Sequence, residues 1–574
     1  MGGNRKLIGV TSVYIFFVYA FSTMVLEWIY LATKEILPLL PLRAVIYVIV
    51  CYIFEFSSGY VLKKFDLCPW DYESFFHFHI MGLITFEYLP VWYVASILGE
   101  YIVIRMHLVV VGGGIAGVNC MTQLLAGARS PDDRFTLVSA SPHVKTVTNW
   151  FRVGQFTEYF NVTESSAPLS TDPRYTFLQA NATGFDKDKQ IVQLDNGNEI
   201  KYDRLCIATG ARPKCPWKHE KLVTLRDTET ALSLQEKLAG AKRVALIGNG
   251  GIATELIFEL RDVEVTWIIR DEYISATFFQ SDVVEFFNKQ IEQGRVEGHK
   301  NAGVLKREKY RTDERIDVDA GDEQLASTST GQSTGCALGP DWCTALTLKG
   351  TTGGHRNVKI ISGREVVGVS GDGELKLQLS GGEQLECDIA IVAIGVEPNS
   401  QLWKGLDKSD IDEGILVDES LRTSNVNVYA CGDVCTVNWK QQSSMWKQMR
   451  LWTQARQMGD LCGRSMISGG QVELDMCFEL FAHVTTFFGY KVVFIGDFKA
   501  EKHKDGGWYV VNRIIDDDQY ARCIMVNHRV VGAVLIGETE LEETIENLIL
   551  NETNLEQIEE NFLDPSIDIE DYFD

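Results

Sequence analysis

Hydrophobic residues are distributed very differently in the first 105 residues and in the rest of the chain. Three long apolar runs occupy this N-terminal part, at residues 7–31, 44–62 and 80–104. Each is long enough for a helix that spans a bilayer, which takes about 20 residues. The first run is also too long for a signal-peptide core, and no small-residue cleavage site follows it. The pattern predicts about three hydrophobic helices in a membrane segment, residues 1–105. A buried three-helix soluble core is the alternative.

Acidic residues interrupt each of the three runs. Glu27, Glu55 and Glu87 would lie within the apolar helices, where a carboxylate costs about 2.5–3.5 kcal/mol near the bilayer centre. We therefore expect these side chains to face one another or a partner. Basic residues flank the runs in nearly equal numbers on the two sides, so the positive-inside rule leaves the topology open.

After residue 105 the pattern changes to short apolar strands that alternate with helix-like stretches. The residues predict a strand at 107–111, a helix at about 115–126 and a second strand at 134–138. The turn before the helix contains the glycines Gly112, Gly114 and Gly117. Such glycines allow a tight turn and let backbone amides at the helix N-terminus approach a pyrophosphate. This unit is typical of a dinucleotide-binding βαβ fold.

The same arrangement occurs a second time. The strand Val244-Ala-Leu-Ile247 leads into a turn with Gly248, Gly250 and Ala253, followed by another helix-like stretch. Alanine is accepted at the third position of this fingerprint. One match is weak, because glycine-rich turns also occur where nothing binds, but two matches in the expected context predict two nucleotide sites. The chemistry that they indicate is electron transfer between a flavin and a nicotinamide.

The residues expected to contact each ribose differ between the two units. An acidic residue usually ends the second strand of such a unit, but the first unit has Ser139 and Ser141 there. Their hydroxyls would make weaker hydrogen bonds. In the second unit Ile269 occupies the acidic position, and Arg270 and Asp271 follow it. Because an acid favours NAD and an arginine accommodates the phosphate of NADP, the choice between NADH and NADPH stays open.

Small residues follow two further predicted strands. The turn Ala208-Thr209-Gly210 ends one, and Ala393-Ile-Gly395 ends another within residues 383–398. Small side chains there permit the close approach of a ligand or a neighbouring strand. Farther on, Gly432 and Asp433 follow a strand that ends at about 430. A carboxylate at the carboxyl end of a strand can hold the ribityl hydroxyls of a flavin.

Composition narrows the class of partner. The 574 residues carry a net charge of −24, which argues against nucleic-acid binding, because such binding usually needs a basic face. Part of that charge lies in the tail 551–574, which has the character of a solvated segment. Residues 303–335 are polar and predict an exposed, mobile insertion. The thirteen cysteines follow neither zinc nor CxxC spacing, so no metal site is predicted.

The two fingerprints, the turn at Thr209-Gly210 and the Gly432-Asp433 pair together resemble the pyridine nucleotide-disulphide oxidoreductase family. The resemblance covers residues 106–574. It implies bound FAD, an NAD(P)H domain inserted between two FAD segments, a smaller C-terminal α+β domain and a role in oxidative-stress defence. Residues 20–105, which contain Cys68-Pro-Trp-Asp-Tyr72, resemble small membrane proteins of the transmembrane-protein-229 or permease-like type.

The predicted fold class is therefore α/β, with two Rossmann-like dinucleotide-binding domains, a C-terminal α+β domain and hydrophobic helices in front. Because Met106 stands directly before the first nucleotide-binding strand, two interpretations of residues 1–105 stay open, a genuine membrane segment and a gene fusion or gene-model artefact. The first places the catalytic part at a membrane facing the cytosol, and the second places it in the cytoplasm or nucleus. The expected domains are 1–105 (membrane), 106–225 and 398–470 (FAD), 226–397 (NAD(P)H) and 471–574 (C-terminal).

The chain departs from the family where disulphide chemistry would reside. Residues 141–149, the stretch that corresponds to the CxxxxC pair, contain no cysteine, and neither a CxxC in the second domain nor a C-terminal His-Pro is present. We therefore expect hydride transfer from NAD(P)H to FAD and delivery to an unidentified small-molecule or protein acceptor. A membrane NADH:quinone dehydrogenase and a non-enzymatic, nucleotide-sensing flavoprotein are the alternatives.

The resemblance also implies two catalytic side chains. In related flavoenzymes a lysine after the second strand of the FAD domain pairs with a glutamate after the second fingerprint, beside the reactive nitrogen of the flavin. Lys145 and Glu255 have the comparable places here. Such a pair would position the isoalloxazine and tune its electronics. Two unrelated surface charges are the alternative interpretation.

Overall fold

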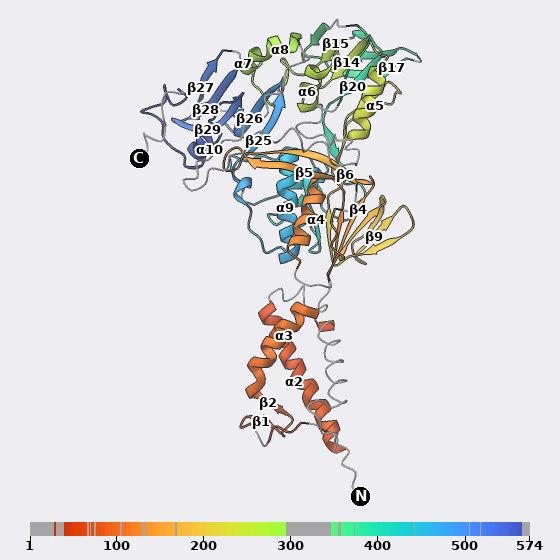
Figure 1. The fold of residues 1–574 in the computed structure, drawn as a ribbon, viewed down its shortest axis with the longest axis vertical. Coiled ribbons are helices and arrows are strands. Elements are labelled where there is room, and N and C mark those ends of the chain that lie inside the picture. Colours follow the sequence, from red (N-terminus) through yellow and green to blue (C-terminus); the bar gives the residue numbers. More distant parts are fainter. Residues whose placement is uncertain are drawn as a thin grey trace, which may run out of the picture. The chain divides into compact units, whose positions relative to one another are not determined.

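The chain folds into two compact units in the computed structural model. One contains residues 1–107 and 128–134 and is called the N-terminal unit, and the other contains residues 108–127 and 135–574 and is called the main unit. Figure 1 gives the order of the elements. The structure describes residues 28–29, 40–65, 68, 70–73, 76–103, 106–128, 133–166, 169–293, 346–353, 357–371, 373–440, 442–503, 506–516 and 518–564. The predicted insertion at 303–335 and nearly all of the run at 7–31 lie outside these residues.

The N-terminal unit contains one long apolar helix, α2 (Leu40–Lys64). Among the described residues, only the stretch Pro41–Lys64 is a helix long and apolar enough to cross a membrane, by length and composition. Apolar side chains such as Leu42, Ile49 and Ile53 are exposed along it. The resemblance to permease-like membrane proteins stays a prediction.

The expectation of a single helix at 80–104 is wrong in its first part. The chain instead forms β1 (His79–Ile80), β2 (Ile84–Thr85), the 3-10 helix η1 (Phe86–Tyr88) and then α3 (Leu89–Val103). Gly82 has a φ of +68° and turns the chain between the two short strands. The 15 residues of α3 extend for about 22 Å, less than the roughly 30 Å of a bilayer core.

Two of the three glutamates in the apolar runs have polar partners nearby. The Tyr72 hydroxyl donates to Glu55 Oε1 at 2.7 Å, and the His77 backbone N–H donates to Glu87 Oε1 at 3.4 Å. These partners belong to the same unit. Glu27 lies outside the described residues.

A five-stranded parallel sheet forms the first layer of the main unit. Its strand order is β23-β11-β3-β4-β7, and the late strand β23 pairs with β11, so the chain returns to this sheet after a long excursion. The predicted strand–helix–strand unit is confirmed as β3, α4 and β4. The bounds are β3 (His107–Val111), α4 (Ile115–Ala126), β4 (Arg134–Ser139), β7 (Tyr175–Gln179), β11 (Arg204–Ile207) and β23 (Val428–Ala430).

A second parallel sheet, with the order β13-β20-β14-β15-β16, carries the second fingerprint. The long strand expected within 383–398 is in fact three strands in three different sheets. Asp388 separates the first two, and its side chain accepts the backbone N–H groups of Lys242 and Arg243 at 2.8 Å. The bounds are β13 (Leu222–Thr224), β14 (Arg243–Ile247), α6 (Gly251–Glu259), β15 (Glu264–Ile268), β16 (Asn357–Ile361), β19 (Gln384–Cys387), β20 (Ile389–Val392) and β21 (Val396–Pro398).

The chain passes between these two sheets through a pair of antiparallel strands. β12 (Ala211–Pro213) leaves the first sheet directly after the Ala208-Thr-Gly turn, and β21 returns from the second sheet, so the two connections pair with each other. This pairing is the arrangement expected when one nucleotide domain is inserted into another. The expected domain boundaries themselves stay a prediction.

The C-terminal part of the main unit is an antiparallel sheet covered by a helix. Its strand order is β25-β26-β29-β28-β27, and side chains of α10 and of residues 555–563 share its apolar core. The expectation of a solvated segment at 551–574 is therefore wrong for 555–563, and residues 565–574 lie outside the described part of the chain. The bounds are β25 (Ala482–Phe487), β26 (Tyr490–Gly496), β27 (Trp508–Ile515), β28 (Gln519–Val526), β29 (Arg529–Ile536) and α10 (Glu542–Leu550).

The remaining elements are short sheets and helices that complete the nucleotide domains. They are β5 (His143–Arg152), β6 (Glu158–Ser166), β8 (Ala182–Asp186), β9 (Ile191–Leu194), β10 (Glu199–Lys201), β17 (Val366–Ser370), β18 (Leu375–Leu379), β22 (Ile415–Val417), β24 (Cys435–Val437), α5 (Thr228–Leu238), α7 (Ser281–Val284), η2 (Glu285–Phe287), α8 (Asn288–Gln293), η3 (Gly432–Val434), α9 (Trp452–Ser468) and η4 (Met476–Phe478).

Candidate functional site

The first glycine turn is packed so closely that a side chain would not fit at two of its positions. Gly112 has a φ of +130°, and a Cβ there would lie 2.0 Å from the Ala208 carbonyl oxygen. A Cβ on Gly117 would lie 1.9 Å from the Gly112 carbonyl oxygen. The Gly112 N–H donates to the Val138 carbonyl oxygen at 2.8 Å. The turn after β3 is thus locked between β4 and the small-residue turn that follows β11.

The second turn repeats this geometry. Gly248 has a φ of +125°, and a Cβ there would lie 2.1 Å from the Ala393 carbonyl oxygen. Ala253, at the third fingerprint position, is fully buried. Each small-residue turn noticed in the sequence therefore packs directly against the first glycine of a fingerprint. Close backbone packing explains why both turns need small residues.

The middle glycines behave differently, because they face open space. Gly114 and Gly250 are the N-caps of α4 and α6, and a Cβ on either would have no heavy atom within 4 Å. A helix N-terminus with free N–H groups and no side chain in front of it is suited to a phosphate. Both turns thus fit a dinucleotide.

The two helix N-termini open onto one cavity. Of the predicted site residues, Gly114, Lys145, Gly210, Glu255 and Asp433 line it. The whole lining consists of Gly114, Ile115, Ala116, Lys145, Ala208, Gly210, Leu225, Arg226, Gly251, Ile252, Glu255, Phe278, Val396, Cys431, Asp433, Arg450, Leu451, Trp452, Ala455, His483, Thr485 and Phe487.

Lys145 lies in β5 at the wall of this cavity. Its Nζ atom is 3.9 Å from Glu164 Oε1 on the neighbouring strand β6. Burial, and after it the positive charge of Arg226, lowers the pKa of the Lys145 ammonium group, while Glu164 raises it. Glu255 of α6 lines the same cavity, and a direct contact between it and Lys145 stays a prediction.

Two arginines that the sequence analysis did not single out hold Asp433. Arg226 Nη1 lies 3.4 Å from Asp433 Oδ2, and Arg450 Nε donates to the Asp433 carbonyl oxygen at 2.8 Å. Arg450 also pairs with Asp412 at 2.6 Å. Burial works to raise the pKa of Asp412, but the Arg450 hydrogen bond and others lower it to about 2. No local motif marks these arginines, because they come from separate segments.

Two of the three hydroxyl groups predicted near the ribose and flavin, those of Ser141 and Thr209, form hydrogen bonds within the protein. Ser139 is buried, and a Cβ on Gly113 would lie 2.5 Å from its Oγ. Ser141 Oγ accepts the His143 N–H at 3.1 Å. Thr209 Oγ1 donates to the Asn399 carbonyl oxygen at 3.1 Å, which ties together the two connections between the sheets. None of these three residues is among those that line the cavity in the described part of the chain.

The residues after β15 divide into a buried and an exposed part. Ile269, in the expected acidic position, is fully buried. Arg270 is exposed and lies 3.8 Å from Glu365. Asp271 Oδ2 accepts Asn249 Nδ2 at 2.7 Å, and Asn249 is the middle residue of the Gly248-Asn-Gly250 turn. The side chain of Asp271, rather than that of Arg270, therefore contacts the fingerprint turn.

The C-terminal sheet contributes a histidine to the cavity. His483 of β25 lines it together with Thr485, and the Thr453 hydroxyl lies 3.1 Å from His483 Nδ1. The Trp452 ring packs against the imidazole, with centroids 4.9 Å apart. Burial lowers the pKa of His483 to about 3. Its position between Phe481 and Val484 in an apolar stretch gives it no distinguishing pattern in the sequence.

Two parallel-sheet domains whose glycine turns open onto one cavity, with an antiparallel C-terminal domain beside it, define a flavin- and nicotinamide-dependent oxidoreductase. The sequence profile of the pyridine nucleotide-disulphide oxidoreductase family matches residues 106–333 and 353–459. That of the rubredoxin NAD+ reductase C-terminal domain matches residues 482–553. The chain belongs to the pyridine nucleotide-disulphide oxidoreductase family, and it is an FAD-dependent NAD(P)H oxidoreductase.

Relatives support this assignment over most of the chain. The human pyridine nucleotide-disulfide oxidoreductase domain-containing protein 1 is 38% identical over 501 residues, which cover 81% of this chain and 97% of the relative. The Drosophila melanogaster protein of the same name is 39% identical and covers 82% and 99%. Among solved structures, the water-forming NADH oxidase from Lactobacillus brevis has a TM-score of 0.54 at 17% identity, with 79% of this chain and 92% of the oxidase covered. That likeness shows the fold.

Proposed function

We propose that electrons pass from NAD(P)H to FAD in the cavity and then leave directly to an acceptor outside the chain, without an enzyme disulphide. The observation that carries this proposal is the single cavity onto which α4 and α6 both open. When bound, NAD(P)H supplies a hydride that FAD accepts at N5 and can pass on as electrons. The chain's own residues bind and orient the two nucleotides.

Each set of residues has a distinct task in this proposal. The residues proposed to bind FAD are Gly112, Gly114, Gly117, Ser139, Ser141, Thr209, Gly210, Gly432 and Asp433. The residues proposed to bind NAD(P)H are Gly248, Gly250, Ala253 and Arg270. Lys145 and Arg226 both line the cavity, and basic side chains there favour an anionic occupant. Glu255 would orient Lys145 and the flavin ring.

The positions of the cysteines support electron transfer to the acceptor without an enzyme dithiol. The eleven cysteines in the described part of the chain are all free. Of these, only Cys431 lines the cavity, and it is buried. Thiol–disulphide exchange requires an accessible thiolate. A buried thiol does not provide one.

The names of similar solved structures suggest what kinds of acceptor suit this fold. They include a ferredoxin reductase from Rhodopseudomonas palustris, which has a TM-score of 0.52 at 16% identity, with 75% of this chain and 91% of that chain covered. They also include the water-forming NADH oxidase described above. The acceptor proposed here is accordingly dioxygen, a small electrophile or an oxidised protein. Reduction of an oxidised acceptor with NAD(P)H would suit a role in oxidative-stress defence.

A quinone is the second candidate acceptor, and α2 favours it. That helix would hold the enzyme at a bilayer, with the main unit facing the cytosol. In its absence the enzyme would belong to the cytoplasm or nucleus. Quinone-dependent NADH oxidation by the membrane-bound full chain would distinguish this candidate from the others.

Alkylation of the cysteines tests whether electrons reach the acceptor without an enzyme disulphide. The enzyme is treated with N-ethylmaleimide before and after reduction by NADH or NADPH, and the oxidation of NAD(P)H is then followed with each acceptor. We expect the same activity in both cases. Inactivation that occurs only after reduction would reveal a redox-active disulphide and contradict the proposal. Absence of turnover with every acceptor, together with nucleotide-dependent binding of a protein partner, would favour a sensing flavoprotein instead.

A further inference from the structure

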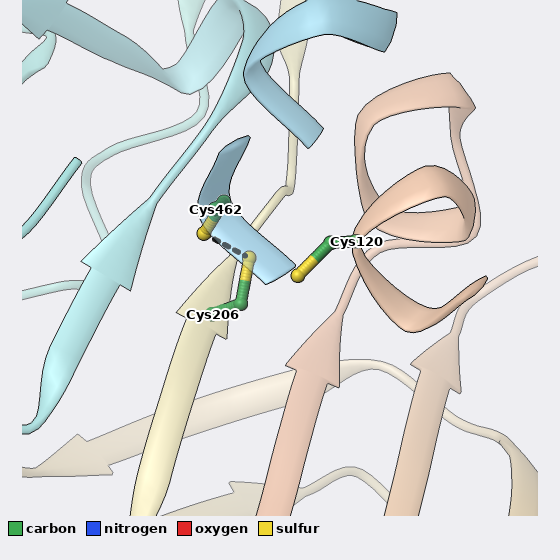
Figure 2. Close-up of side chains that lie close together, drawn as sticks. All are labelled: Cys120, Cys206 and Cys462. Carbon is green, nitrogen blue, oxygen red and sulfur yellow. Dashed lines mark hydrogen bonds between the residues drawn. The ribbon is translucent and has the colours of Figure 1, made fainter. Parts of the chain in front are cut away.

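Four buried cysteines from four separate segments meet beside the cavity. They are Cys120 of α4, Cys206 of β11, Cys431 after β23 and Cys462 of α9, and each side chain is 0% exposed. We call these four residues the sulfur cluster. Figure 2 shows the sulfurs of Cys206 and Cys462 facing each other, with the Cys120 sulfur directed towards them from its helix. Their positions in the sequence follow no metal-binding spacing and so predict no site here.

Close packing of two helices brings the sulfurs together. α4 and α9 lie side by side (Figure 1). A Cβ on Gly459 would lie 2.4 Å from the Ala116 carbonyl oxygen, and a Cβ on Gly463 would lie 2.7 Å from that of Cys120. These two glycines on one face of α9 therefore let the helix backbones approach. Cys462, next to Gly463, is thereby held against Cys120.

The sulfurs of the sulfur cluster lie close to one another. Cys206 Sγ lies 3.4 Å from Cys431 Sγ and 3.5 Å from Cys462 Sγ. The sulfurs of Cys120, Cys206 and Cys462 all lie within 4.8 Å of one another. Sulfurs around an ion at about 2.3 Å would be about 3.8 Å apart. The sulfurs of Cys120, Cys206 and Cys462 are therefore close enough to share one ion, with Cys431 beside Cys206.

We propose that the sulfur cluster binds one thiophilic d10 metal ion, with Cu+ favoured over Zn2+. The donor set is entirely sulfur, and the Met466 thioether lies next to it, 3.8 Å from Cys120 Sγ. Thiolate and thioether sulfurs select soft ions of this kind. Structural zinc sites use thiolate, imidazole and carboxylate donors, whereas a thioether such as that of Met466 is a donor typical of Cu+.

The chemistry of the cluster favours a metal over a redox disulphide. The side chains of Cys120 and Cys462 have no exposed surface, so an external disulphide does not reach them for thiol exchange. A metal acquired while the chain folds meets no such barrier. The competing interpretation is four reduced thiols that pack as small apolar side chains.

Metal analysis of the full-length flavoprotein tests the proposal. The protein is produced in medium supplemented with copper and zinc, since a buried site must be filled during folding, and its metal content is measured by mass spectrometry. We expect about one equivalent of copper or zinc. The double variant C206S/C462S should lose at least about nine-tenths of it, whereas C523S, at a cysteine buried in the C-terminal sheet, should keep it. A metal-free wild type, or a double variant with unchanged metal content, would overturn the proposal.

X-ray absorption of the wild-type protein gives a second test that does not depend on how the variants fold. The absorption edge of the bound metal should show a first shell of sulfur at about 2.2–2.3 Å. A first shell of nitrogen or oxygen would place the metal elsewhere and overturn the assignment. The flavin content of the same samples reports the integrity of the nucleotide domains, so failure here is distinguishable from failure of the proposed electron transfer.

Discussion

At the scale of single residues, the two fingerprints separate positions that shape the backbone from positions that leave room for a ligand. A Cβ added to Gly112 or Gly248 would lie 2.0–2.1 Å from a carbonyl oxygen of a small-residue turn. Gly114 and Gly250 face open space. The same motif thus contains two kinds of glycine, and substitution should distinguish them.

The variants Gly112→Ala and Gly114→Ala should fail in different ways. Gly112→Ala places a methyl group against backbone and forces an L-residue to a φ of +130°, so we expect a loss of about 2 kcal/mol or more in unfolding free energy. Gly114→Ala should change stability by less than about 1 kcal/mol and should weaken FAD binding at least about tenfold, because its methyl group points into open space at the N-terminus of α4. Urea unfolding and flavin titration of the apoprotein measure the two effects. Equal loss of stability in both variants would refute the distinction.

Glu255→Gln tests the proposed catalytic pair. It should leave FAD bound and should slow flavin reduction by NAD(P)H about tenfold or more, which corresponds to about 1.4 kcal/mol in the barrier. Glu259→Gln, near the other end of α6, is the matched control and should react like the wild type. Anaerobic stopped-flow absorbance gives both rates. Unchanged kinetics in Glu255→Gln would exclude the pair.

The buried histidine predicts a pH dependence of stability. Burial lowers the pKa of His483 from 6.5 to about 3, so between these values the unfolded state binds a proton that the folded state does not. The free energy of unfolding should therefore fall as the pH drops below 6.5, by up to about 1.4 kcal/mol per pH unit. In His483→Gln this loss should be absent. Urea unfolding between about pH 7.5 and about pH 5 compares the two proteins, and parallel curves would contradict the assignment.

At the scale of elements, local patterns predicted the strands and helices that carry the fingerprints. The strand at 107–111 and the helix at 115–126 have the predicted bounds, because the apolar residues and glycines that define them are neighbours in sequence. The stretches 80–104 and 383–398, each predicted as one element, contain several. In both, the breaks depend on turns and on contacts such as that of Asp388 with the start of β14. An apolar run alone does not show these.

A single carboxylate joins α10 to the loop between β5 and β6. Glu546 is fully buried, and its Oε1 accepts the Thr157 N–H at 2.7 Å while Oε2 accepts the Gln155 N–H at 2.5 Å. We expect Glu546→Gln to lower the free energy of unfolding by about 2–3 kcal/mol, because the new amide group would face donors. Glu556→Gln, at an exposed site in the same domain, should change it by less than about 0.5 kcal/mol. Equal urea midpoints for the two variants would show that the hydrogen bonds of Glu546 do not stabilise the fold.

At the scale of the whole molecule, the cavity collects residues from segments that are far apart in the chain. Gly114 and Glu255 could be predicted because each belongs to a motif, whereas Arg226, Arg450 and His483 could not, since only the folded chain brings them to one cavity. The sulfur cluster has the same origin, as its four cysteines come from two helices and two strand ends. Spacing along the sequence therefore predicts the nucleotide turns well and says little about what faces them.

The central claim is that this cavity passes electrons from a nicotinamide to a flavin, and anaerobic absorbance tests it most directly. The spectrum of the purified full-length protein is recorded before and after the addition of NADH or NADPH in the absence of oxygen. We predict a bound oxidised flavin whose visible band is bleached by at least one of the two nucleotides. A colourless protein, or a flavin band that neither nucleotide changes, would contradict the account.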